Sequence, residues 1–364
     1  MDEITPMIKS DFVGLKEVLP MINKLLADRS LPPVKEPSEM LEIMLREVYG
    51  YLPDPPEKLT FEVMHSQKTC AGKATLKNMV AHCLVKGKEF SFPFTAVIPT
   101  NSKKVPFFVH INFRSDVPDR YMPTEELIDN GFAVFSFCHR EVTYDNEDMS
   151  DGIYGILYPD GKRGLHDAGK VAVWAWAAQR VMDYAQTLGD LLDLSKGVVC
   201  GHSRLGKTAL LAAATDSRFW CAYSNDSGCT GAAVSRGKRG ESVTVINNAF
   251  PLWFCENYKK YAHKEYAMPF DQHYLVGAIA PRYVCIGSAT EDIWADPVSE
   301  NLCCAAASPV YEKMGKKGFV HNGELAKAGE SFFEGSIGYH LREGSHYFSR
   351  TDWLKLIEFL KSKM

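Results

Sequence analysis

Two stretches near the start of the chain carry apolar residues at helical spacing. They are VGLKEVLPMINKLL (13–26) and SEMLEIMLREVYG (38–50), and the proline-containing stretch SLPPVKEP separates them. Apolar residues three or four positions apart form one apolar face on a helix, whereas the prolines mark a break between two helices. We therefore predict that residues 1–57 form a helical extension that packs on the main domain.

The pattern changes to strands from about Leu59 to Ser136, where short apolar or alternating runs are bounded by turn residues. The runs are ATLKNMVAHCLV (74–85), FSFPFTAVIP (90–99), PFFVHINF (106–113) and GFAVFSF (131–137). A polar loop over residues 140–164 follows them. Helical spacing then returns over residues 167–188, where we predict a long helix.

Strands and helices alternate through the rest of the chain. The segments are GVVCG (197–201), TALLAAAT (208–215), CAYSND (221–226), YVCIGSA (283–289), SIGYHLR (336–342) and WLKLIEFLK (353–361). Such alternation predicts an α/β domain over residues 58–364, with a mostly parallel central sheet flanked by helices in three layers. In such sheets ligands bind beyond the carboxyl ends of the strands, so residues that directly follow a strand are the first candidates for a site.

Charge and composition narrow the range of partners. The 364 residues are 46% hydrophobic, and 41 basic against 45 acidic residues give a net charge of −4 without long runs of one sign. This excludes a nucleic-acid footprint and a polybasic membrane patch, and no apolar stretch approaches the roughly 18 residues of a membrane span. A small or oligosaccharide ligand fits better, while the oligomeric state stays open.

The amino terminus and the cysteines bear on the cellular compartment. MDEITPMIKSDF has acidic residues where a signal peptide has basic ones, and the ten cysteines contain no C-x-x-C pair. We expect free thiols in a cytoplasmic protein.

The strongest chemical signal is VVCGHSRLGKTALLA, in which a strand ends, Ser203 occupies the turn and a helix of small residues follows. This is the context of a nucleophile elbow, where a strained turn exposes the serine hydroxyl and small residues such as Gly201 and Gly206 give the backbone room. The spelling is G-H-S-R-L-G, with Leu205 where a second glycine is usual. A serine at this position can also be a simple helix cap, and that alternative stays open.

Position in the chain selects the base among the 11 histidines. His346 lies in the short loop EGSH between the last predicted strand and the last predicted helix, which is where α/β-hydrolases carry the base. His340 is the rival, but it falls inside the strand pattern, so we expect it to be a sheet residue.

The segment GHSRLGK resembles the G-C-S-R-x-G-K signature of carbohydrate esterase family 15, the glucuronoyl esterases. Four further segments resemble the family's blocks in the same order: DSGCTGA, RGE with FPLWF, FDQHYLVGAIAPR and EDIWADP. The resemblance is clearest from about Tyr158 to the end of the chain, and it implies an α/β-hydrolase fold.

The resemblance implies a role for five residues. Ser203 would be the nucleophile that attacks a uronic-acid ester, and Arg204 would stabilise the oxyanion together with a backbone N–H. Lys207, Glu241 and Trp294 match positions that contact the sugar. A cation, a carboxylate and an aromatic ring suit a pyranose, which offers hydroxyl groups and C–H faces.

Two carboxylates compete for the role of the acid that orients His346. Asp226 follows a strand and matches the glutamate that many members use, whereas Asp292 follows the next strand and matches the other acid position of the family. The aspartate side chain at 226 is one methylene shorter than that glutamate, so we favour Asp292 and leave Asp226 as the alternative.

The chain departs from the family at two positions. The cysteine before the serine is His202 here, and Tyr347 follows the histidine where relatives carry the partner cysteine, so the implied disulfide is missing.

We therefore expect a serine esterase that hydrolyses 4-O-methyl-glucuronoyl esters of xylan-derived or lignin-carbohydrate substrates through an acyl-enzyme, without a metal or organic cofactor. The alternatives are an acetyl-xylan or general carbohydrate esterase that uses the same residues, and a non-catalytic carbohydrate-binding protein of this fold.

Overall fold

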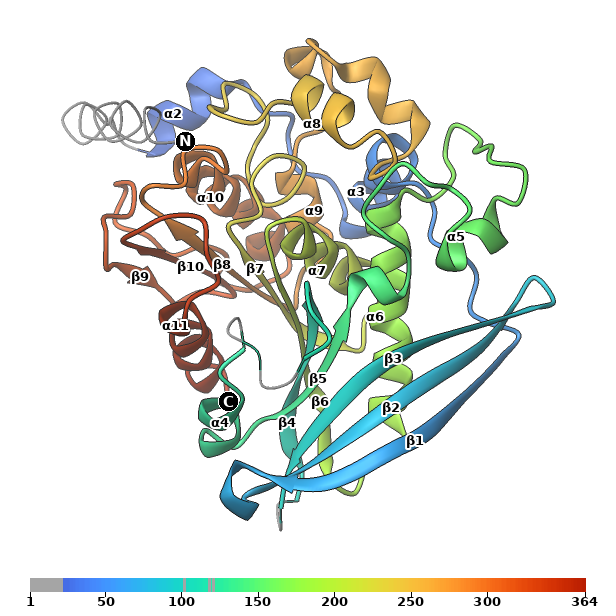
Figure 1. Ribbon diagram of the computed structural model, residues 1–364. Coiled ribbons are helices and arrows are strands. Elements are labelled where there is room, and N and C mark those ends of the chain that lie inside the picture. The colour runs from blue at the N-terminus through green and yellow to red at the C-terminus, as the bar shows by residue number, and fades with distance from the viewer. Residues whose placement is uncertain (1–21, 101–102, 117–118, 120–121) are drawn as a thin grey trace, which may run out of the picture.

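A ten-stranded mixed sheet organises the chain, and its strands lie side by side in the order β1-β2-β3-β5-β4-β6-β7-β8-β10-β9 (Figure 1). The computed structural model describes residues 22–100, 103–116, 119 and 122–364. The strands are β1 (Lys58–Thr69), β2 (Ala74–Val85), β3 (Lys88–Pro99), β4 (Val105–Asn112), β5 (Ala133–Cys138), β6 (Leu192–His202), β7 (Phe219–Asn225), β8 (Tyr283–Ala289), β9 (Ser331–Phe332) and β10 (Ile337–Arg342).

The sheet has a parallel centre and antiparallel edges. Strands β5, β4, β6, β7, β8 and β10 run parallel to their neighbours in this series. Strands β1, β2 and β3 form an antiparallel meander that joins β5, and the short β9 pairs antiparallel with β10. The predicted α/β class with a mostly parallel centre is therefore confirmed.

Burial explains why the strand patterns differ along the sheet. Every residue of β5 is buried, and β7 and β8 are buried apart from one residue each near their start, because helices cover both faces of the central sheet. Strand β2 instead alternates between buried and more exposed positions, which is typical of a strand with one face toward the core. The predicted strand over residues 74–85 is confirmed with these bounds.

Helices lie on both faces of the sheet. The α-helices are α2 (Ile22–Arg29), α3 (Pro37–Met44), α4 (Thr124–Asp129), α5 (Gly152–Leu157), α6 (Lys170–Gln186), α7 (Arg204–Thr215), α8 (Val243–Ala249), α9 (His273–Gly277), α10 (Pro297–Lys313) and α11 (Arg350–Lys361). Shorter turns are η1 (Leu45–Tyr49), η2 (Cys70–Gly72), η3 (His139–Glu141), η4 (Glu256–Tyr261) and η5 (Glu265–Ala267).

The two faces of the sheet have separate apolar cores. Helices α6, α7 and α10 contribute to the larger core on one face, whereas α4 and α11 close the smaller core on the other. None of the helices within the described residues is long and apolar enough to cross a membrane.

The predicted helix over residues 167–188 is α6, which is buried along most of its length. The prediction of a loop over residues 140–164 is wrong in one respect, since this segment contains the short helix α5. Helix α10 was not predicted from spacing. It is buried on nearly all sides, so its apolar residues show no amphipathic period.

The amino-terminal helices pack on the main domain. Helix α2 lies against α10, and α3 lies against α9. The phenol of Tyr49 donates a hydrogen bond to the carbonyl of Thr230 at 2.8 Å. The predicted helix over residues 38–50 is α3 followed by the π-helical turn η1. The predicted helix over residues 13–26 lies partly outside the described residues, and its final part belongs to α2.

Candidate active site

Four candidate residues follow the carboxyl ends of four neighbouring parallel strands. Ser203 follows β6, Asp226 follows β7, Asp292 follows β8 and His346 follows β10. Because parallel strands end at the same edge of the sheet, segments from distant parts of the sequence meet there. The rings of His202 and His346 lie 4.4 Å apart between centroids, which brings the end of β6 beside the loop after β10.

Ser203 occupies a strained turn between β6 and α7. Its φ of 57° and ψ of −128° lie in a backbone region that residues other than glycine rarely adopt. This is the backbone conformation of a nucleophile elbow. Its side chain makes no capping hydrogen bond to α7, so the helix-cap alternative is wrong.

The glycines around Ser203 are needed for space, as predicted. A Cβ at Gly206 would lie 2.9 Å from Ser224 Oγ, and one at Gly201 would lie 2.3 Å from the carbonyl oxygen of Leu205. Leu205 itself is fully buried in the core, which explains why a large residue stands where a second glycine is usual.

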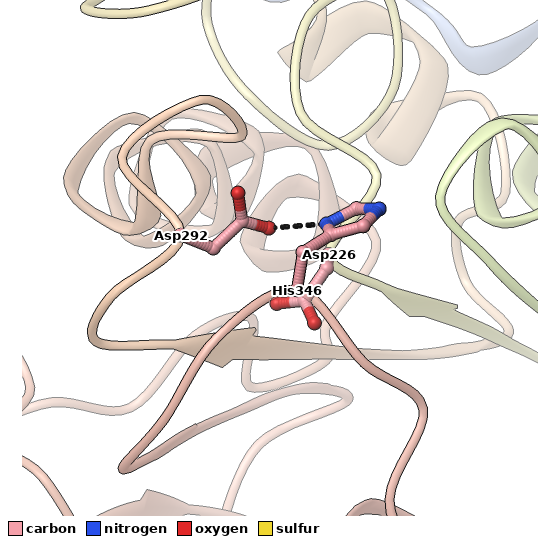
Figure 2. A group of neighbouring side chains, drawn as sticks. All are labelled: Asp226, Asp292 and His346. Atoms are coloured by element: carbon pink, nitrogen blue, oxygen red, sulfur yellow. Dashed lines mark hydrogen bonds and ion pairs between the residues drawn. The ribbon is translucent and has the colours of Figure 1, made fainter. Parts of the chain in front are cut away.

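Asp292 and His346 form a direct hydrogen bond (Figure 2). The Nδ1 atom of His346 lies 2.6 Å from Oδ2 of Asp292. The other carboxylate oxygen of Asp292 accepts the backbone N–H of Ala295 at 3.1 Å, so the acid is oriented from two sides. Asp292 is buried, whereas the side chain of His346 is 42% exposed. With Nδ1–H donated to a carboxylate, Nε2 of the neutral imidazole is the atom that can accept a proton.

Asp226 lies close to the same histidine but has a different partner. Its Oδ2 accepts a hydrogen bond from Nη2 of Arg342 at 3.3 Å, and its buried Oδ1 has no hydrogen-bond partner among the described residues. Burial, and then the negative charge of Asp292, raise the pKa of Asp226 well above its ordinary value, while Arg342 opposes this effect. Of the two acids left open by the sequence, Asp292 is the one that bonds His346.

The two carboxylates and the imidazole could also be considered as metal ligands. Ligand atoms from Asp226, Asp292 and His346 all lie within 4.8 Å of one another. However, Arg342 already donates a hydrogen bond to Asp226, and Asp292 already accepts two hydrogen bonds. These contacts favour a proton-transfer site over a cation site.

Arg204 opens helix α7 directly after Ser203, and its guanidinium group lies among aromatic rings. Its Cζ atom is 4.8 Å from the ring centroid of Trp253, 5.5 Å from that of Phe113 and 5.7 Å from that of Phe250. It also pairs with the carboxylate of Asp145. Burial lowers the pKa of Arg204 to about 10, so the group remains a cation at neutral pH, and the Asp145 carboxylate favours the same form.

The structure brings together the three residues predicted to contact sugar. The backbone N–H of Glu241 donates to the carbonyl of Trp294 at 3.2 Å, and Nζ of Lys207 lies 4.0 Å from Oε2 of Glu241. Lys207 also donates to the carbonyl of Ser227, and burial lowers the pKa of its ammonium group. Lys207 and Glu241 are buried, but Trp294 is 56% exposed, so its ring is available for contact with a ligand.

His340 lies inside β10 as expected. It is buried, and its Nε2 lies 2.9 Å from the hydroxyl oxygen of Tyr223. Sequence reasoning missed Arg342 and Asp145. The position of Arg342 at the end of the last predicted strand, four residues before His346, was the signal that could have indicated the first. Asp145 lay in a polar loop without a distinguishing pattern.

Comparison with known proteins gives one consistent result. The family model described as "Glucuronyl esterase, fungi" matches residues 82–315. A curated relative named Carbohydrate esterase MZ0003, from an unknown prokaryotic organism, is 32% identical over 91% of this chain and 84% of its own length. The 4-O-methyl-glucuronoyl methylesterase of Hypocrea jecorina is 28% identical over 76% of this chain, and the match covers 57% of that protein.

A solved structure of a glucuronoyl esterase from Solibacter usitatus superposes with a TM-score of 0.82 at 33% identity, covering 91% of this chain and 92% of the other. The likeness therefore extends over both the sequence and the three-dimensional arrangement of nearly the whole chain. The α/β-hydrolase fold is thereby confirmed. The chain is a carboxylic ester hydrolase that belongs to carbohydrate esterase family 15, the glucuronoyl esterases.

Proposed function

We propose that Ser203, His346 and Asp292 form a catalytic triad that hydrolyses esters of a glucuronic-acid carboxyl group. The observation that carries this proposal is the bond between Nδ1 of His346 and Asp292, formed at the edge of the sheet where Ser203 occupies its strained turn. An acid, a histidine and a serine that follow neighbouring strands have the arrangement that nucleophilic acyl transfer requires.

In the first step Nε2 of His346 accepts the proton of the Ser203 hydroxyl while Oγ attacks the ester carbonyl. Asp292 stabilises the imidazolium that forms. The Arg204 cation and a backbone N–H stabilise the oxyanion, and this charge exists only in the transition state and the tetrahedral intermediate. The imidazolium then gives its proton to the leaving alcohol. Water attacks the acyl-enzyme by the same route and releases the uronic acid.

The ion pair of Arg204 with Asp145 has a role in this scheme. Together with the aromatic rings around it, the pair fixes the guanidinium group before substrate binds. A cation that is already oriented stabilises an oxyanion without reorganising during the reaction.

The substrate assignment is supported by Lys207, Glu241 and Trp294. Buried Lys207 and Glu241 offer a donor and an acceptor for sugar hydroxyl groups, and exposed Trp294 offers a flat face for the pyranose ring. The name of the Hypocrea jecorina relative, a 4-O-methyl-glucuronoyl methylesterase, agrees with such a ligand.

Hydrolysis of benzyl glucuronate and of an acetylated sugar, by the wild type and by Ser203→Ala, tests the proposal. We expect uronic-acid release from the first ester, and a loss of about 10⁴-fold or more in kcat on removal of the nucleophile. Undiminished release by Ser203→Ala would contradict the mechanism.

A second candidate is a broader carbohydrate esterase, which the more general name of the prokaryotic relative favours. Trp294→Ala distinguishes the two functions. Trp220→Ala is the control, because Trp220 lies near the start of β7, away from the strand ends that carry the site. If the ring binds a uronic acid, Trp294→Ala raises KM for benzyl glucuronate about five- to tenfold and leaves the acetyl ester unaffected. Equal effects on both esters would favour the broader esterase.

A further inference from the structure

Arg342 connects the candidate base to two buried carboxylates. It is the last residue of β10, and its Nε donates to Oδ2 of Asp352 at 2.8 Å, while its Nη2 donates to Oδ2 of Asp226 at 3.3 Å. The side chains of both aspartates are fully buried, and that of Arg342 is only 10% exposed. A planar guanidinium group can bind acceptors on several sides at once, which an ammonium group on a flexible chain cannot do with the same geometry.

The same guanidinium group holds the backbone on both sides of His346. Its Nη2 donates to the carbonyl of Ser345 at 3.1 Å and to the carbonyl of Tyr347, which are the two residues adjacent to the histidine. Nη1 donates to the carbonyl of Glu343 at 3.1 Å. Four of the seven residues 342–348 thus take part in one set of hydrogen bonds centred on Arg342. His346 lies between two of them, Ser345 and Tyr347.

Asp352 fixes the other end of this loop. Its Oδ2 accepts the backbone N–H and the hydroxyl of Ser349, each at 2.7 Å, and the Ser349 hydroxyl in turn accepts the backbone N–H of Asp352. This reciprocal pair is a capping box that starts α11. The Arg342–Asp352 pair therefore joins the end of β10 to the start of α11, and the loop between them has both ends held.

Asp226 adds an attachment to β7. Its backbone N–H donates to the carbonyl of Gly287 in β8 at 2.8 Å, which fixes the turn after β7 against the next strand. Arg342 and Asp226 thus connect the histidine loop to β8, which precedes Asp292. They also connect it to β7, which pairs with β6, the strand before Ser203.

We propose that Arg342 is a positioning residue that holds the His346 loop in register with Asp292 and Ser203 by pairing with Asp226 and Asp352. It does not touch the reacting atoms. Its contribution is to keep the imidazole within hydrogen-bond reach of both partners, and a displacement of the base by about 1 Å is enough to cost roughly 100-fold in rate. The inference rests on the proposed role of His346 as the base, and it assigns Asp226 to the loop rather than to the triad.

The test compares Arg342→Gln and Arg342→Lys with Arg218→Gln. Arg218 is a matched control because it also pairs with two aspartates, Asp183 and Asp216. It lies directly before β7, at the opposite end of this strand from Asp226. We expect Arg342→Gln to lower kcat on benzyl glucuronate about 10- to 100-fold with KM changed less than about threefold. Arg342→Lys should retain more activity than Arg342→Gln because it keeps the positive charge. It should be less active than the wild type because lysine lacks the planar set of donors. Arg218→Gln should stay within about twofold of the wild type.

Two further readouts separate positioning from general destabilisation. The rate at which diisopropyl fluorophosphate labels Ser203 depends on the base but not on uronate binding, so we expect it to fall in parallel with kcat in the Arg342 variants. Hydrogen exchange of the peptide over residues 343–349 should become faster in Arg342→Lys and remain unchanged in Arg218→Gln.

The outcomes are distinct. Labelling and loop exchange in the folded Arg342 variants equal to the wild type would overturn the positioning role. Labelled wild-type enzyme without turnover of benzyl glucuronate would contradict the proposed substrate, while slower labelling of the Arg342 variants would still support the inference. If the wild type were not labelled at all, the proposed nucleophile would be wrong, and the exchange measurement would decide whether Arg342 holds the loop.

Discussion

The turns after β7 and β8 present two buried aspartates to the same histidine, and only one of them bonds it. Asp226 and Asp292 follow adjacent parallel strands, and oxygen atoms of both lie within 4.8 Å of a nitrogen of His346. Figure 2 shows the single bond that distinguishes them, from Asp292 to Nδ1.

The difference arises from what faces each turn. Asp226 faces a guanidinium group, which is permanently charged and itself held by Asp352. Asp292 faces an imidazole that is partly exposed, and a backbone N–H orients its other oxygen. The comparison teaches that the position of an acid after a strand makes it available to the site, whereas the facing loop decides its role.

Replacing Asp292 should give the largest effect. Asp292→Asn keeps the size of the side chain but removes the charge that stabilises the imidazolium and favours the tautomer that donates from Nδ1. We expect kcat on benzyl glucuronate to fall about 10³- to 10⁴-fold. Steady-state kinetics at saturating substrate measure this, and a loss of less than about tenfold would show that another acid orients His346.

Replacing Asp226 should have a much smaller effect on the chemical step. Asp226→Asn still offers an oxygen to Arg342, and Arg342 keeps its pair with Asp352. We expect kcat to fall less than about tenfold, because the amide weakens the attachment of the histidine loop but leaves the Asp292–His346 bond intact. The ratio of the two losses is the measurement that matters. A loss at Asp226→Asn as large as that at Asp292→Asn would mean that both carboxylates act on the base.

Much of the fold could be predicted because its strands have clear patterns. The strand over residues 74–85 alternates since only one of its faces packs on the core. The run YVCIGSA coincides with β8 because a central strand is covered on both faces and is buried along nearly all of its length. Helix α10 escaped prediction for the opposite reason. A helix buried on nearly all sides has no broad polar face to give it a period.

The site could be predicted in part for similar reasons. Ser203 and His346 were indicated by their places directly after strands, which is a local property of the sequence. The pairing of Asp226 with Arg342 joins residues 116 positions apart, and that of Asp292 with His346 joins residues 54 apart. No local pattern states which of two neighbouring strand ends will face which loop, because that depends on the register of the folded sheet.

A final prediction concerns stability rather than rate. It involves Glu300, which accepts a hydrogen bond from Gly228 in the turn that begins at Asp226. Glu300 in α10 is fully buried, and its carboxyl group accepts the backbone N–H of Gly228 at 2.8 Å and the hydroxyl of Ser288. Burial raises the pKa of Glu300 to about 7 from an ordinary value of 4.5. The folded protein therefore holds a proton that the unfolded chain releases between these two values.

The sign of the effect follows from this difference. Between pH 4.5 and about 7 the folded state binds more protons than the unfolded state at Glu300, so the contribution of this group to the free energy of unfolding decreases as the pH rises. A shift of this size corresponds to roughly 3 kcal/mol. Glu300→Gln resembles the protonated acid and cannot ionise, so it should remove this part of the pH dependence.

Urea unfolding of the wild type and Glu300→Gln at pH 5 and pH 8 measures the contribution. We expect the variant to gain stability relative to the wild type at pH 8 compared with pH 5, while kcat stays within about twofold, because Gln can still accept the Gly228 N–H. Parallel pH dependence in the two proteins would mean that Glu300 stays ionised in the folded state. A large fall in kcat would instead show that the hydrogen bond from Gly228 to Glu300 helps to position His346, in addition to the contacts of Arg342.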